Sequence, residues 1–440
     1  MKIKNFFKTA IIKVFGSINV LLCLPLSCIH IIRSFSTLRQ LEIIVFMPEG
    51  GFGHTITGPD LARRFFKGKR CAFIAFSEFN RHNRKVASIW PDIFFLFLPL
   101  SVGVKVGSRP IILPLLKWYK KNASLIVLKV LRFINTSFEL HDNEELYKRT
   151  SFSEDFAYKK RLPKNLIDKD WCNSCVRVVG YLNLTNTVSV SEVHLPEKWR
   201  KKIKRRIQKI DDADKKQFKL CGMYLRQKGR DSKDISSLSR CGSRLEEYVP
   251  AIQFLNSAGY LVLLMGDEAI SEELRINLKD KLIDYSVLGV DRESFELFVS
   301  LETDIFISEA GGGAWLSGFN GIPRLFMNAF PLGYGQQNSW VFYKTVTDKD
   351  GKMVDAEQAL VEHEFRYDFK DYLVHSNNAE ELRSAVASFL EDIKKPQEYD
   401  PGAGIVSKLS EYSWIKQSHA KISPAWLKIQ SCRKEKYVQA

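Results

Sequence analysis

DIFISEAGGGAWLSGFNGIPRLFMN (residues 304–328) holds two short apolar runs on either side of a glycine-rich loop. Runs as continuously apolar as DIFIS and RLFMN are typical of strands that are buried on both faces, as in a parallel sheet. Gly311, Gly312 and Gly313 lie between them, and we expect this loop to open a short helix. Backbone amides at the start of such a helix can meet an anion, because glycine lets the ligand approach closely.

Polar residues end both runs. Ser308 and Glu309 follow the first strand, and Asn328 ends the second. In open α/β sheets, ligands bind at the carboxyl ends of the strands, so all three are candidate binding residues. A carboxylate repels phosphate, and we therefore assign Glu309 to a ligand hydroxyl.

Two further apolar runs in this half of the chain end in polar residues. FKLCGMYLR ends in Arg226 and is followed by Lys228, while YLVLLMGD ends in Gly266 and Asp267. Cations at a strand end suit a phosphate or diphosphate, and arginine offers two parallel donors. A solvated loop would also account for the cations, and Asp267 can bind a sugar hydroxyl or cap a turn.

The same pattern occurs nearer the N-terminus. Residues 41–48, 70–78 and 92–101 are predicted buried strands, 175–184 is a possible further strand, and 115–133 has helical character. Alternation of strands and helices predicts parallel α/β sheets. We expect two doubly wound Rossmann-type domains facing each other across a cleft.

The loop EGGFGHTITGP follows the first of these strands. Its candidate ligand-facing residues are Glu49, Gly50, Gly51 and Gly53. The spacing lacks the third glycine of the dinucleotide fingerprint, although Glu78 closes the next strand as that fingerprint requires. A dinucleotide site in the 50–58 loop and a plain tight turn both stay open.

His54 lies in this loop and is the first candidate for a general base, because an imidazole can take a proton from a hydroxyl near neutral pH. A histidine that caps or orients a neighbour is the competing interpretation. Asp60 is the second candidate base. It could also orient His54, but we favour capping of a helix that begins near Thr57.

Charge is concentrated in two places. The net charge is +16, and no acidic residue precedes Glu42. Residues 14–32 are uncharged and follow a lysine-rich end, which predicts an interfacial membrane anchor, a single-pass signal-anchor or a soluble first helix. The block from Glu197 to Ile210 predicts a basic helix, either an ordinary surface helix with one packed stripe or a helix that faces a membrane. No nucleic-acid-binding signature accompanies it.

The order YLRQKGRD, YVPAIQFLNSAGY, MGD, ISEAGGGAWLSGFNGIP resembles the donor-nucleotide region of GT-B glycosyltransferases. It is most similar to a bacterial glycosyltransferase family linked to surface-polysaccharide genes, over residues 218–330. GGFGH resembles the acceptor-side glycine loop of the same superfamily. Relatives often carry histidine where this chain has Met223 and Tyr224, and serine-glycine where it has Glu309 and Ala310.

The resemblance implies an α/β, GT-B-like enzyme that moves a sugar from a nucleotide-sugar donor to a glycan or lipid-linked acceptor, with no metal and no further cofactor. Metal-dependent transferases of the other class need Asp-x-Asp after a buried strand, and the Asp-x-Asp pairs here lie in polar stretches. An NAD-dependent dehydrogenase or epimerase, or a non-catalytic glycan-binding relative, stays open. Expected partners are the nucleotide sugar, the acceptor and an anionic membrane surface, with the chain on the cytoplasmic face and no nucleic acid.

The expected parts are an apolar, basic membrane-anchor helix (1–36), an N-terminal Rossmann-like acceptor domain (37–197), a basic interdomain helix or linker (198–217), a C-terminal Rossmann-like nucleotide-sugar domain (218–390) and a C-terminal helical tail that could return to the N-terminal domain (391–440).

Overall fold

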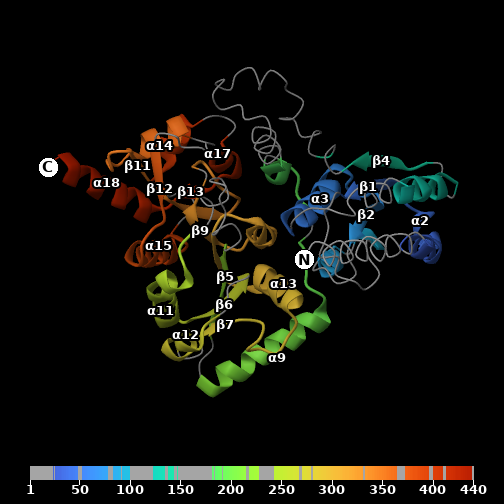
Figure 1. Cartoon of the computed structure of the whole chain (residues 1–440), viewed down its shortest axis with the longest axis horizontal. Helices are drawn as coiled ribbons and strands as arrows, with labels where there is room; N and C mark the ends of the chain where they lie inside the picture. Colours follow the sequence, from blue (N-terminus) through green and yellow to red (C-terminus); the bar gives the residue numbers. More distant parts are fainter. Residues whose placement is uncertain are drawn as a thin grey trace, which may run out of the picture. The chain divides into compact units, whose positions relative to one another are not determined.

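The protein forms two compact units, Met1–Tyr147 and Lys148–Ala440, and each is described by itself. Figure 1 labels their helices and strands. The computed structural model describes residues 25–47, 52–77, 83–90, 92–99, 122–133, 137–142, 181–182, 184–190, 192–214, 218–226, 242–266, 270–278, 281–330, 332–363, 372–395, 400–409 and 413–438, with Cys23 and Leu146.

The first unit holds a four-stranded sheet in the order β3-β2-β1-β4, with every pair parallel. Its strands are β1 (Ile43–Met47), β2 (Cys71–Ser77), β3 (Ile93–Pro99) and β4 (Glu139–Asp142). The connecting helices are α3 (Phe52–Phe65), α4 (Asn83–Val86) and η1 (Ala87–Ile89). The three predicted strands are confirmed. The sequence ELHD of β4 is too short and polar to show a strand pattern, and only its pairing with β1 makes it one.

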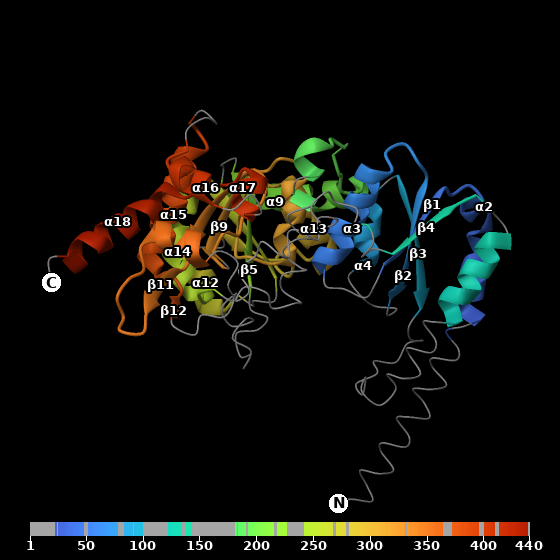
Figure 2. The ribbon, with the colours of Figure 1, turned by 90° about the horizontal axis from the view of Figure 1, so that it is seen from above.

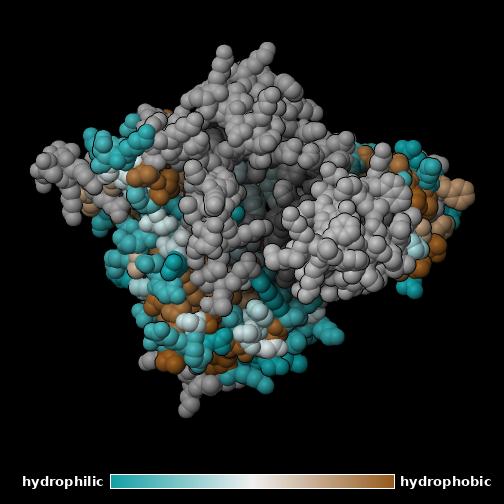
Figure 3. Space-filling model, viewed as in Figure 1, coloured by the Kyte–Doolittle hydropathy of each residue, from teal (hydrophilic) through white to brown (hydrophobic). Residues whose placement is uncertain are grey.

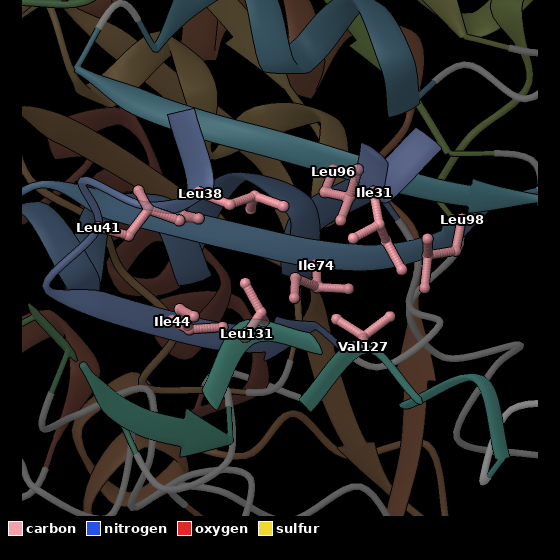
Figure 4. Packing of buried hydrophobic residues seen from close by; sticks show 10 residues of the cluster. Ile31, Leu38, Leu41, Ile44, Ile74, Leu96, Leu98, Val127 and Leu131 are labelled. Atoms are coloured by element: carbon pink, nitrogen blue, oxygen red, sulfur yellow. The ribbon is translucent and has the colours of Figure 1, made fainter. Parts of the chain in front are cut away.

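One face of this sheet packs under helices that precede β1 and a helix that lies between β3 and β4 along the chain. Ile44 of β1, Ile74 of β2 and Leu96 of β3 contact Ile31 and Leu131 in one buried cluster (Figure 4). Alternate residues of each strand point to this face, because side chains alternate along a strand. The covering helices are residues 25–33, α2 (Phe35–Leu38) and residues 122–133, which confirms a helix within the predicted 115–133 stretch.

The second unit is built on a seven-stranded parallel sheet in the order β13-β10-β9-β8-β5-β6-β7. Its strands are β5 (Lys219–Leu225), β6 (Tyr260–Gly266), β7 (Leu282–Ile283), β8 (Ile305–Ser308), β9 (Arg324–Ala329), β10 (Ser339–Tyr343) and β13 (Lys421–Ile422). The predicted strands correspond to β5, β6, β8 and β9. Counted from β5, the order is the 3-2-1-4-5-6 order of Rossmann folds with one more strand, and the first unit follows its 3-2-1-4 part.

The other elements of this unit surround the sheet (Figures 1 and 2). They are α9 (Glu197–Asp214), η3 (Leu245–Tyr248), α11 (Val249–Ser257), α12 (Glu272–Asn277), α13 (Arg292–Glu302), η4 (Gly312–Ala314), η5 (Leu316–Gly318), β11 (Thr345–Asp348), α14 (Ala356–His363), β12 (Tyr372–His375), α15 (Ala379–Asp392), α16 (Ala403–Lys408), α17 (Trp414–Ser418) and α18 (Pro424–Val438). Gly259 follows α11 with φ +86°, a left-handed conformation that ends the helix and that glycine adopts without strain. Helix α18 packs on α15 and β10.

The possible strand at 175–184 is wrong where the structure describes it, since residues 181–182 and 184–187 are helical. Tyr181 packs edge-on against Trp315, with ring centroids 5.6 Å apart, and its side chain is buried. An apolar run of this length suits a buried helix as well as a strand, and only its packing partner distinguishes them.

The basic block forms α9, and its apolar stripe is packed. Ile203 and Ile207 are buried, while the lysines and arginines between them face solvent. Lys204 forms an ion pair of 2.9 Å with Glu302 at the end of α13. The interpretation as a surface helix with one packed stripe is therefore confirmed.

The N-terminal anchor predicted for residues 1–36 lies largely outside the described residues, which begin with Cys23 and then residue 25. In the part of the chain that the structure describes, no helix is both long and apolar enough to span a bilayer. The choice between an interfacial anchor and a signal-anchor stays a prediction.

Replacement of Ile207 by alanine should lower the free energy of unfolding by about 2–5 kcal/mol, because it leaves a cavity under α9. Gln208→Ala changes the exposed neighbour and should cost less than about 0.5 kcal/mol. Urea unfolding followed by circular dichroism measures both. Equal losses in the two variants would show that the stripe of α9 is not packed in solution.

Candidate functional site

The candidate site lies where β5 and β8 end. These strands are neighbours in the sheet although two other strands, β6 and β7, and the helices around them lie between β5 and β8 along the chain. The connections leave β5 and β8 in opposite directions. Such a switch point opens a crevice at the carboxyl ends of the strands. Arg226 directly follows β5, and Glu309 directly follows β8. The Glu309 amide donates to the Tyr224 carbonyl at 3.0 Å, so the two strands stay paired up to the crevice.

The Glu309 carboxylate ties three chain segments together. One oxygen accepts from the Tyr248 hydroxyl at 2.6 Å, and the other accepts from the backbone amides of Arg226 at 2.7 Å and Gly242 at 3.3 Å. The side chain is fully buried. Gly242 has no room for a side chain, since an added Cβ would overlap the carboxylate. In this structure Glu309 therefore holds protein groups, and its contact with a ligand hydroxyl stays a prediction.

Burial raises the pKa of Glu309 to about 7. The Tyr248 hydroxyl, the Arg226 amide, the charge of Lys344 and the Gly242 amide all stabilise the ionised form and lower the pKa, but they do not offset the loss of water. The carboxyl group thus changes charge near neutral pH while it is bonded to the segments around the crevice.

Asn328 extends this network to a fourth segment. It adopts a left-handed backbone conformation with φ 50°, and its amide nitrogen donates to the Tyr248 hydroxyl at 3.0 Å and to Ser243 at 3.2 Å. Its amide oxygen accepts from the backbone and side chain of Asn377 at 2.7 and 3.0 Å. Asn328 is buried, and its two bonds from Asn377 hold the loop before α15 beside the crevice. Its predicted contact with a ligand stays a prediction.

The glycines of the site surround one aromatic ring. A Cβ on Gly311 would lie 3.0 Å from the Tyr224 ring, and one on Gly313 would lie 2.9 Å from it. Gly266, with φ +116°, lies on the same ring, where an added Cβ would be 3.5 Å away. The glycine loop thus rests on Tyr224, and this contact requires glycine whether or not a ligand is bound.

The short helix expected after the glycines is two separate 3-10 turns, η4 and η5. Turns of three residues have almost no macrodipole, so the helix dipole expected to favour an anion is missing. Contact of the glycine amides with a donor stays a prediction. Gly312 begins η4. The turns are held by Arg324, whose buried guanidinium donates to the Ala314 carbonyl at 3.1 Å and to Gln336 at 2.6 Å, and also to the Gln337 carbonyl. No ion pair of Arg324 occurs among the described residues, and burial lowers its pKa to about 10.

Two polar atoms at the crevice have no protein partner among the residues that the structure describes. They are Nε of the half-buried Arg226 and the hydroxyl of the buried Ser308. The Arg226 guanidinium otherwise makes one long bond of 3.4 Å, to the Ala310 carbonyl. Buried donors without partners are uncommon in folded proteins and favour a ligand that accepts from them. Lys228 and Asp267 lie outside the described residues.

In the first unit, Glu49, Gly50 and Gly51 lie outside the described residues. Gly53 and His54 belong to the first turn of α3, and the side chain of His54 is not described. Helix α3 thus begins five residues before the predicted start near Thr57 and continues through Pro59.

Capping by Asp60 is wrong, because Asp60 is the ninth residue of α3. Its buried carboxylate accepts from Arg64 Nε at 2.8 Å. Residues six apart point about 120° apart around a helix, so Asp60 does not lie on the same face as His54. The base assignment itself stays a prediction.

Sequence reasoning missed four residues of the site: Tyr224, Gly242, Tyr248 and Asn377. Tyr248 stands at the start of the YVPAI motif, so its position in the motif was visible but its bond to Glu309 was not. Gly242 and Asn377 come from loops with no strand or helix pattern, and only folding brings them to the network.

No protein-family model matches this chain, and no curated protein matches it. It is similar to the glycosyl transferase family 9 structure from Veillonella parvula (TM-score 0.44, 10% identity, 80% of this chain and 98% of that one). It is also similar to E. coli ADP-heptose LPS heptosyltransferase II (TM-score 0.42, 10% identity, 81% and 100%) and to Phytolacca americana UGT2 complexed with UDP-2-fluoro-glucose and pterostilbene (TM-score 0.38, 12% identity, 90% and 100%). Likeness at these TM-scores is too weak to establish a shared fold or activity.

Glu309→Gln should remove a pH dependence of stability. The pKa of Glu309 is higher in the folded protein than in the unfolded chain, so the folded state binds the extra proton and stability falls as pH rises from about 4.5 to 7. The free energy of unfolding of the wild type, relative to the variant, should decrease on the order of 3 kcal/mol over this window and stay level above it. Parallel curves in urea unfolding at pH 5 to 8 would contradict this.

Gly313→Ala should lower the free energy of unfolding by about 1–3 kcal/mol, because the new methyl group overlaps the Tyr224 ring. Gly404→Ala in α16 is the matched control, since nothing lies within 4 Å of the added atom. It should be neutral or slightly stabilising. Thermal unfolding of both proteins measures the difference, and an equal response would mean that the glycine loop does not rest on Tyr224.

Proposed function

We propose that this chain is a GT-B-type glycosyltransferase that transfers a sugar from a nucleotide sugar to a glycan or lipid-linked acceptor without a metal ion. One observation carries the proposal. The chain contains two parallel sheets in Rossmann order, and in the second, Arg226 and the Gly311–Gly313 loop meet at the switch point. In the proposal, the second unit holds the donor and the first supplies acceptor-side residues.

The diphosphate of the donor needs positive groups that water does not screen. Arg226 supplies a guanidinium whose Nε has no partner among the described residues, and its backbone position is set by Glu309. Ser308 supplies a buried hydroxyl, and Lys228 and Asp267 are proposed donor contacts on the following loops. Arginine binds two phosphate oxygens at once, which fixes the orientation of the diphosphate as well as its charge.

His54 is the proposed base. It takes the proton of the acceptor hydroxyl while that oxygen attacks the anomeric carbon, and the bond between that carbon and the diphosphate oxygen breaks. The nucleoside diphosphate leaves with the electron pair of that bond. Asp60 is the second candidate, although its pairing with Arg64 favours a structural role.

Arg226→Gln should weaken the binding of a nucleoside diphosphate by roughly 10- to 100-fold, because one charge-assisted contact is lost. Arg383→Gln on the outside of α15, where the arginine pairs with Glu380, should leave the affinity unchanged. Calorimetry with UDP, ADP, GDP and NAD as separate ligands measures this. If no diphosphate nucleotide binds, or if NAD alone binds and Arg226→Gln leaves that binding unchanged, the proposed donor site is wrong.

His54→Ala should lower kcat by about 10²- to 10⁴-fold with little change in donor affinity, as expected when a general base is removed. A screen of nucleotide sugars for release of the nucleoside diphosphate identifies the donor with which this is measured. Full activity of His54→Ala would eliminate His54 as the base and leave the donor site standing.

A further inference from the structure

The helices that cover the sheet of the first unit are apolar on both sides. Toward the sheet, Ile31, Leu38, Val127 and Leu131 are buried. Away from it, five large apolar side chains are exposed, and we call them the outer face: Ile29 (43%), Ile32 (70%), Phe35 (46%), Leu125 (45%) and Phe133 (90%). A helix on the surface of a soluble protein normally presents polar residues to water. The apolar outer face therefore indicates that another surface binds there and shields it from water.

The exposed side chains come from two neighbouring helical segments. Residues 25–38 and 122–133 lie side by side in Figures 1 and 2, and Figure 3 shows apolar residues exposed over the region of α2. Their inner residues belong to one cluster, which joins the segments into a single surface (Figure 4). The outer face therefore belongs to two helical segments that pack together over the same sheet.

The charges on this patch have one sign. Arg33, Arg39, Lys129 and Arg132 are exposed, and residues 25–41 and 122–133 contain no aspartate or glutamate. None of the four cations forms an ion pair among the residues that the structure describes. A purely apolar partner would leave these charges uncompensated. Anionic headgroups would neutralise them, at about 1 kcal/mol for each basic residue near the surface of a membrane.

We propose that the outer face lies on the surface of a lipid bilayer that carries anionic headgroups. Its apolar side chains enter the boundary between headgroups and acyl chains, and its four cations contact lipid phosphates. Mixed apolar and basic surfaces of this kind bind in the plane of the interface. The chain that leads into the patch supports this occupant, because residues 14–24 are uncharged and are preceded by four lysines. The inference does not depend on the reaction proposed above.

Flotation of the full-length protein with phospholipid vesicles tests the apolar part. Ile32→Glu and Phe133→Glu should each weaken partition into vesicles of phosphatidylcholine and phosphatidylglycerol by roughly tenfold or more. Ile276→Glu is the matched control, because Ile276 in the second unit is 69% exposed and should bind as the wild type does. Equal flotation of all three variants overturns the proposal.

The cations are tested separately. Arg33→Gln combined with Arg132→Gln should weaken binding to the anionic vesicles and leave the weak binding to pure phosphatidylcholine unchanged, and added salt should imitate the double variant. Loss of binding to both kinds of vesicle, or none, contradicts the assigned role of the charges.

A local probe separates this face from any other contact that the chain makes with lipid. In a background in which Cys28, Cys172, Cys175, Cys241 and Cys432 are replaced by serine, an environment-sensitive dye on Ile32→Cys should shift to the blue when anionic vesicles are added, and the same dye on Ile276→Cys should not. A blue shift without vesicles that follows protein concentration would show a second copy of the chain on the face. A shift on adding RNA would show nucleic acid. Either result, or no shift at all, overturns the proposal.

Discussion

The Glu309 carboxylate is the interaction on which the crevice of the second unit depends. It binds the amide that follows β5, the amide of Gly242 and the hydroxyl of Tyr248. A buried carboxylate costs free energy unless its lone pairs are satisfied, and three donors satisfy it here. The position of Arg226 is consequently set by its own backbone bond to Glu309 rather than by its side chain.

The contacts around Tyr224 explain the glycine-rich loop without a ligand. Three consecutive glycines are typical of a phosphate-binding loop, but two of them are required here because the Tyr224 ring leaves no room for a side chain. The 3-10 turns that follow the loop have almost no helix dipole. A phosphate at this site would therefore depend on Arg226 and on single amides.

The first unit shows the opposite case, because several of its apolar side chains are exposed and have no packing partner among the residues that the structure describes. Its helices need apolar residues on their inner side to bury the sheet, and that need is met by the cluster around Ile31 and Leu131. Nothing in the unit's own core calls for Ile32 or Phe133 to be apolar. They are exposed beside cations that have no ion pair among the described residues, and a membrane surface would cover both.

The apolar runs along the chain were enough to predict the α/β class and the positions of seven strands, because buried parallel strands require continuous apolar runs such as 41–48 and 260–267. They also located Arg226 and Glu309 at strand ends. Three features could be seen only in the folded chain. Strands β5 and β8 are neighbours, Glu309 faces inward to Tyr248, and β4 is a strand while residues 181–182 and 184–187 are helical. The reason is physical: periodicity records which residues are buried, while strand order and the partners of a buried polar group depend on contacts between segments far apart along the chain.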